Sequence, residues 1–276
     1  MVFGILQSGT YGWFASRTDF TVAGTVVIPE GGVSPVWLYV GVGVVILVFF
    51  FWHIRSRERA GKDPLVSIRL FHNRTSNLGL GTQNIQWLTL QGSFFVISVF
   101  LQKVWGYSAI QTGLMLLPAI TGILVSSAAA QRLAQRRSQR SLIRAGFVAT
   151  TVGMVLLLAL VREHSSIATF VPGLLLMGLG IGVMLTSSVN VVQSSFPEAD
   201  QGDISGVSRS VSNLGSSLGT ALAGSVLVAA SFPGGEPFAL SIATLAVISL
   251  VGLVLAVLLP KQPAALPPKE PAAPHP

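Results

Sequence analysis

The sequence alternates long apolar runs with short segments that hold the charged residues. Seven runs, each between 17 and 34 residues long, contain no Lys, Arg, Asp or Glu. An α-helix of about 20 apolar residues crosses the hydrocarbon core of a bilayer. The pattern therefore predicts seven transmembrane helices, at residues 36–52, 78–102, 110–130, 145–161, 170–192, 207–231 and 238–260.

Composition supports a membrane protein and excludes several other classes. Hydrophobic residues make up 51% of the chain, charged residues 10%, and the mean hydropathy is +0.69. These values exclude a soluble enzyme, a collagen and a disordered chain. The net charge of +7 does not indicate a nucleic-acid partner, because the basic residues lie between the spans and not on one folded surface.

The distribution of Lys and Arg predicts the orientation in the membrane. Fourteen basic residues, with Arg209 among them, are assigned to one side of the seven spans. Only Arg17, Lys103 and Arg162 fall on the other side. Short basic loops stay cytoplasmic during insertion. We therefore expect a multi-pass protein of the plasma or inner membrane, with its N-terminus outside and its C-terminus in the cytoplasm.

The second predicted span carries a polar and aromatic stripe. Asn84, Gln91 and Ser98 recur at seven-residue spacing, and Trp87 lies close to them at about 100° per residue. Amides are costly in lipid, so this stripe is expected to face inward. It either joins helices by hydrogen bonds or lines a cavity for a large amphipathic ligand, and the cavity is slightly favoured. A second polar face, formed by Thr82, Gln86, Thr89 and Ser93, is expected to pack.

Proline and small residues predict the shape and packing of other spans. Pro118 lies well inside the third span and should bend it, as a static bend or as a working hinge. Small residues on one helical face let two helix backbones approach closely. They are Gly173, Gly178, Gly180 and Gly182 in the fifth span, and Ser208, Ser212, Gly215, Ser216, Gly219, Thr220 and Gly224 in the sixth.

The spans lack the residues of an enzyme or a metal centre. No Asp or Glu lies inside a predicted span, and the chain contains no Cys. His53, His72 and His164 lie at or beyond span ends, and no second ligand is spaced to join any of them. We therefore predict no catalytic residues, no metal and no cofactor, and no proton relay within these helices.

Several short motifs lie in the loops and at the ends of the predicted spans. They are Asp63-Pro64-Leu65, Arg69 to Thr75, Phe100-Leu101-Gln102, Gly106-Tyr107-Ser108, Gln111-Thr112-Gly113, Leu117-Pro118, and Pro197 with Gly202, Ser205 and Gly206. Together they resemble the C-terminal half of the fourteen-helix drug:proton antiporter branch of the major facilitator superfamily. Residues 131–140 also resemble the second copy of that family's loop signature, with Gln131, Gln135 and Ser138 in place of its Gly, Asp and Gly.

The resemblance implies the fold and the domain organisation. It implies an all-α integral membrane protein of seven transmembrane helices, in which a C-terminal six-helix bundle follows one extra helix. The implied parts are an external segment at 1–35 that ends a preceding helix, the extra helix and a basic loop at 36–77, and the bundle at 78–260. Independently of the resemblance, the glycines and prolines around residues 21–28 predict a short hairpin strand there. The Pro- and Ala-rich composition of 261–276 predicts a disordered cytoplasmic tail.

The resemblance also implies a function, which is the C-terminal part or a half-length form of a proton-driven multidrug efflux transporter, incomplete on its own. Asn84, Trp87, Gln91 and Ser98 are then the substrate-binding candidates. The implied partners are the lipid bilayer, an amphipathic or cationic small molecule, and either an N-terminal six-helix half or a second copy of the chain. The main alternative is a membrane assembly subunit, or a truncated remnant, that does not transport.

Overall fold

The computed structural model describes Gly4, Gln7 and residues 11–22, 25–59, 72–161, 166–230 and 236–260. The motif Asp63-Pro64-Leu65, His164 and the predicted tail at 261–276 lie outside the described residues. Long α-helices dominate the described ranges, and the only β-structure in them is at the N-terminal end. The protein is an all-α integral membrane protein, as the pattern of apolar runs predicts.

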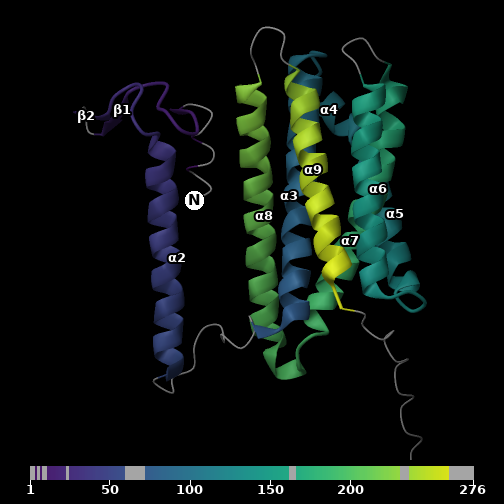
Figure 1. Ribbon diagram of the computed structural model, residues 1–276. Coiled ribbons are helices and arrows are strands. Elements are labelled where there is room, and N and C mark those ends of the chain that lie inside the picture. The colour runs from purple at the N-terminus through teal and green to yellow at the C-terminus, as the bar shows by residue number, and fades with distance from the viewer. Residues whose placement is uncertain are drawn as a thin grey trace, which may run out of the picture.

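A β-hairpin precedes the first long helix. Strand β1 (Phe20–Val22) pairs antiparallel with β2 (Thr25–Ile28), which confirms the expected hairpin near residues 21–28. The Phe20 ring also contacts Tyr39 of helix α2 (Pro35–Arg59) edge-on, at 6.2 Å between ring centroids. Figure 1 shows the hairpin at one end of α2 and the helix standing beside the other helices. Only 11% of the apolar window of α2 is buried.

The remaining helices form one bundle (Figure 1). Six helices of the described chain are long and apolar enough to cross a membrane, and the bent pair α4–α5 makes a seventh crossing when it is counted as one span. The seven predicted spans coincide with these crossings. The bundle helices are α3 (Arg74–Lys103), α4 (Ala109–Met115), α5 (Leu117–Leu133), α6 (Gln139–Leu160), α7 (Phe170–Gln193), α8 (Gln201–Ala229) and α9 (Pro237–Leu258), with 3₁₀ turns η2 (Ile167–Thr169) and η3 (Glu198–Asp200).

Two of the motifs that carry the family resemblance lie at the starts of helices α3 and α4. The Asn73 side chain accepts hydrogen bonds from the backbone N–H groups of Thr75 and Ser76 and so caps α3. Its amide also donates to the Ser195 carbonyl after α7, at 3.2 Å. Ser108 and Gln111 form a reciprocal capping box at the start of α4. Such caps satisfy backbone donors that have no partner within the helix.

Pro118 lies where the third span bends. Helices α4 and α5 meet at Leu116 with a bend of 42°. Pro118 occupies the first turn of α5, where its missing N–H costs no helical hydrogen bond, and the chain restarts there as a new helix. The predicted bend is confirmed.

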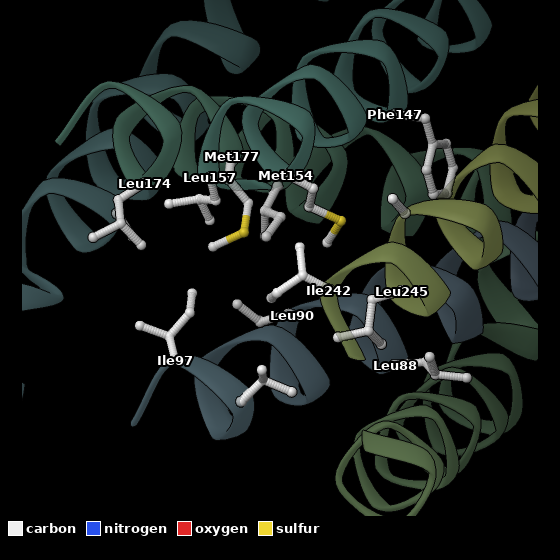
Figure 2. Packing of buried hydrophobic residues seen from close by; sticks show 14 of the residues in the cluster. Leu88, Leu90, Ile97, Phe147, Met154, Leu157, Leu174, Met177, Ile242 and Leu245 are labelled. Atoms are coloured by element: carbon white, nitrogen blue, oxygen red, sulfur yellow. The ribbon is translucent and has the colours of Figure 1, made fainter. Parts of the chain in front are cut away.

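Large apolar side chains from four helices fill the centre of the bundle. Figure 2 shows Ile97 of α3, Met154 and Leu157 of α6, Met177 of α7 and Ile242 of α9 directed toward one another. All five side chains are fully buried. Truncating a buried Leu, Ile or Met to Ala costs about 2–5 kcal/mol in soluble proteins.

Glycines bring the helix backbones into contact. A Cβ atom on Gly178 of α7 would collide with the backbone of Ala119 in α5. A Cβ atom on Gly180 would collide in the same way with Gly146 of α6. Helix α7 therefore packs closely against both neighbours through its glycines, as the small-residue pattern of the fifth span predicts.

Candidate functional site

Helix α3 packs against neighbours on three faces and leaves a fourth open. At about 100° per residue, the open face carries Trp87, Gln91, Phe94 and Ser98, between the contacts to α7 and those to α8. Gln91 is exposed, and the other three side chains are half-buried. The three packed contacts are Gln86 with Ser188 of α7, Leu88 with Gly219 of α8, and Ile85 with Gly252 of α9.

The four predicted site residues lie on or beside this open face. Asn84 is half-buried at its edge, where its Nδ2 donates to the Val211 carbonyl of α8 at 3.0 Å. Asn84 therefore joins two helices, which is the packing role that the sequence left open. Trp87 lies beside Gly215 of α8, close enough that a Cβ atom on that glycine would approach its side chain at 3.2 Å.

The second polar face of α3 is inside the bundle, as predicted. Thr82, Gln86, Thr89 and Ser93 are each 1% exposed or less. The Gln86 amide and the Ser188 hydroxyl of α7 are hydrogen-bonded at 2.9 Å. This face therefore packs and is not available to a ligand.

Gln83 joins α3 to α8 by buried hydrogen bonds, and the sequence pattern did not identify it as a contact residue. Its side chain is 3% exposed, and its Nε2 donates to the hydroxyls of Ser208 and Ser212 in α8, at 2.8 Å each. The serines belong to the predicted small-residue stripe, but Gln83 lies on neither predicted face of α3. Its burial and its two hydroxyl partners are visible only in the structure, so the residue pattern offered no signal for it.

The exposed face of α8 is polar over more than half of the helix. Between Gln201 and Ser217, Leu214 is the single large apolar side chain that is exposed. The sequence pattern predicted close packing for this helix but not a second, polar face. The other exposed residues in that stretch are Gly202, Asp203, Ser205, Gly206, Arg209, Ser210, Asn213 and Ser217.

Helix α9 has the opposite character on its exposed face. Its exposed side chains between Pro237 and Leu258 are all apolar, which suits contact with lipid. Because polar side chains are costly in lipid, the exposed face of α8 suits water or another protein. These exposed residues of α9 are Leu240, Val247, Leu250, Val251, Val254, Val257 and Leu258.

Arg209 lies within a helix and not in a loop. The charge count assigned it to the cytoplasmic loops, but α8 begins at Gln201. At 1.5 Å per residue, Arg209 is therefore about 12 Å along the helix. Its side chain is exposed on the polar face of α8. The predicted span at 207–231 already contained Arg209, and the structure confirms that it lies in the helix. Counting Arg209 with the loop charges was wrong, because α8 begins eight residues before it.

The bundle therefore belongs to the class of multi-pass helical membrane proteins, and one of its long helices, α8, has a polar exposed face. Among the described residues, no group of three His, Asp or Glu residues is placed to hold a metal ion.

The family model of the Major Facilitator Superfamily matches residues 20–220 and 79–276. The chain belongs to this superfamily.

Curated relatives are described as drug-resistance or efflux proteins. The multidrug resistance protein Stp of Mycobacterium tuberculosis is 31% identical over 62% of this chain and 32% of its own length. The multidrug efflux pump LfrA of Mycolicibacterium smegmatis is 30% identical over 68% of the chain and 36% of its own length. The puromycin resistance protein pur8 of Streptomyces alboniger is 30% identical over 68% and 37%. The chain spans about a third of the length of these relatives.

Proposed function

We propose that this chain is the C-terminal part of a proton-driven multidrug efflux transporter. The observation that carries the proposal is the contrast between the polar exposed face of α8 and the apolar exposed face of α9. A bundle surrounded by lipid on all sides would be apolar all round. A bundle with one polar face suits a transporter, in which that face borders a water-filled path.

The substrate-binding residues in this proposal are Asn84, Trp87, Gln91 and Ser98. Trp87 offers an aromatic surface to an amphipathic or cationic molecule, and Gln91 and Ser98 offer hydrogen bonds. Asn84, which is bonded to Val211, positions the edge of the face beside α8. The proposed activity is transport without chemical conversion of the substrate.

A second six-helix bundle completes the path in this proposal. Alternating access requires two bundles that rock about a site near the middle of the membrane. An N-terminal six-helix half is the proposed partner, and a second copy of the chain is the other candidate. Residues 78–260 then act as one transporter bundle, with residues 1–35 outside, residues 36–77 as an extra helix and basic loop, and 261–276 as a cytoplasmic tail.

A non-transporting assembly subunit is the second candidate function. The polar, small-residue face of α8 could dock permanently on another membrane protein instead of bordering a water-filled path. The two functions differ in what Gln91 and Trp87 do, because docking alone requires no selection among small molecules.

Substitution of the open face tests the proposal. In a transporter that joins this chain to an N-terminal bundle, Gln91→Ala or Trp87→Ala should alter the relative export of two dissimilar compounds by about tenfold, or 1.4 kcal/mol. Gln91→Ala should leave the amount of folded protein unchanged, because Gln91 is exposed. Trp87 is half-buried against the apolar core, so export by Trp87→Ala is compared per amount of folded protein. Resistance assays and quantitative immunoblotting of membranes provide the two measurements.

Gln83→Ala is the matched control on the same helix. This substitution removes a buried amide and leaves Ser208 and Ser212 without their partner. It should lower the amount of folded protein, and it should therefore reduce the export of all compounds alike. If Gln91→Ala instead loses folded protein in proportion to export, the open face of α3 serves packing, and the assembly function is favoured.

The proposed orientation places the N-terminus outside the cell. The exposed Arg136 and Arg137 lie in the turn between α5 and α6, at the end of the bundle opposite the β-hairpin (Figure 1). In the Cys-free chain, a Thr21→Cys variant should react with a membrane-impermeant maleimide in intact cells. A Gln135→Cys variant should react only after the cells are opened. The reverse labelling pattern would contradict the proposed orientation.

A further inference from the structure

The turn between α5 and α6 concentrates positive charge at one corner of the bundle. Five arginines lie between residues 132 and 144, and no carboxylate occurs between residues 104 and 162. Arg132, Arg136 and Arg137 are exposed. The backbone N–H groups of Arg136 and Arg137 both donate to the Leu133 carbonyl, so the turn is tight. Ser138 then caps α6, with its side chain accepting from the Ser141 N–H.

The other two arginines attach this corner to the end of α9. Arg144 donates to the carbonyls of Ala256 and Val257, at 3.3 Å and 3.0 Å. Arg140 also donates to the Val257 carbonyl. Carbonyls in the last turn of a helix have no partner within the helix and carry partial negative charge. The basic turn is therefore held beside the end of α9.

An apolar surface begins at the same corner. Helices α6 and α9 lie side by side, joined at mid-length by a 2.9 Å hydrogen bond from Thr151 to Ser249. At about 100° per residue, the exposed stripe of each helix starts next to this line of contact. Because the helices run antiparallel, both stripes fall on the same side. They include Val148, Val152 and Val155 of α6 and Leu250, Val254 and Val257 of α9, which are 43% to 58% exposed.

We propose that this corner binds an anionic phospholipid. The phosphate lies against the guanidinium groups of the α5–α6 turn, chiefly Arg136 and Arg137, and the acyl chains lie along the apolar stripes of α6 and α9. Guanidinium groups bind phosphate with charge-assisted, often bidentate hydrogen bonds. The apolar stripes favour a lipid over an acidic loop, because a loop would leave them uncovered. The proposal does not depend on transport.

The test compares phosphatidylglycerol with phosphatidylcholine on the purified full chain. Native mass spectrometry measures lipid retention, and thermal unfolding measures stabilisation, each in detergent with either lipid added. Each basic residue near a membrane surface contributes about 1 kcal/mol to anionic lipid binding. Arg136→Gln combined with Arg137→Gln should therefore weaken retention of phosphatidylglycerol about thirtyfold, which is about 2 kcal/mol at 1.4 kcal/mol per tenfold.

Arg55→Gln combined with Arg57→Gln is the matched control, because these exposed arginines lie at the end of α2. The control should retain phosphatidylglycerol as the unchanged chain does. Equal losses in the two double variants, or equal retention of both lipids by the unchanged chain, would overturn the proposal. Inorganic phosphate distinguishes the source of the anion. If phosphate alone stabilises the protein as much as the lipid, the corner is a free-anion site and not a lipid site.

Discussion

Replacing Gly219 by leucine is expected to prevent recovery of folded protein. A Cβ atom at this position would collide with the Leu88 carbonyl oxygen and would lie 2.9 Å from Leu88 C and Cα. The obstacle is backbone in α3, so no side-chain rotation can relieve it. Overpacking a core costs about 1–3 kcal/mol even when side chains can move. A larger loss is expected here, out of a total stability of roughly 5–15 kcal/mol for a domain.

Gly206→Leu is the control on the same helix. A Cβ atom on Gly206 would meet nothing within 4 Å, and leucine favours helix more than glycine does. This variant should be recovered in amounts close to the unchanged chain. The measurements are the monodisperse fraction after detergent extraction and the thermal unfolding midpoint. Equal recovery of the two variants would mean that α3 and α8 do not pack as closely as the structure shows.

The chain alone is expected not to couple drug movement to proton movement. The chain by itself, reconstituted in liposomes with an acidic interior, is expected to show no drug-dependent proton flux above that of empty liposomes. A proton relay at depth requires a group that gains and loses a proton there. The described carboxylates lie near helix ends or between helices, and the deepest within a bundle helix, Asp203, is in the first turn of α8. A second copy of the chain would duplicate the same interior.

A fluorescent cationic drug and a pH dye, followed together, provide the measurement. A full-length relative in the same liposomes is the positive control. If the chain alone moves protons in proportion to the drug, the proposed need for a second bundle is wrong. His53, in the last two turns of α2, would then be the first residue to substitute in the search for the proton carrier.

Part of the fold follows from the sequence alone. The charge-free runs predict seven spans because a charged side chain is costly in hydrocarbon and a helix needs about 20 apolar residues to cross it. The bend at Pro118 also follows locally, because proline cannot continue a helix without a break or a kink. Close packing at a glycine does not, since Gly178 and Gly219 meet a neighbouring backbone but Gly206 meets nothing.

The candidate site followed from the sequence only in part. The seven-residue spacing placed Gln91 and Gln86 on different stripes of α3, but it did not show which stripe the neighbouring helices cover. The structure leaves Gln91 exposed and buries Gln86 against Ser188. Substrate contact by the four candidate residues stays a prediction.

Which segments cross the membrane can be predicted from the residues of each segment, since transfer into lipid depends on each helix separately. Which face of each helix is covered depends on how the helices pack in the bundle. The tertiary structure placed Gln83 between two serines of α8, exposed Arg209 on a polar face, and attached Arg144 to the end of α9. A side chain is buried only when a neighbouring helix covers it, so burial depends on two helices and not on one. A stripe of polar residues indicates that its side chains need hydrogen-bond partners. Only the position of the neighbouring helix shows whether those partners are present.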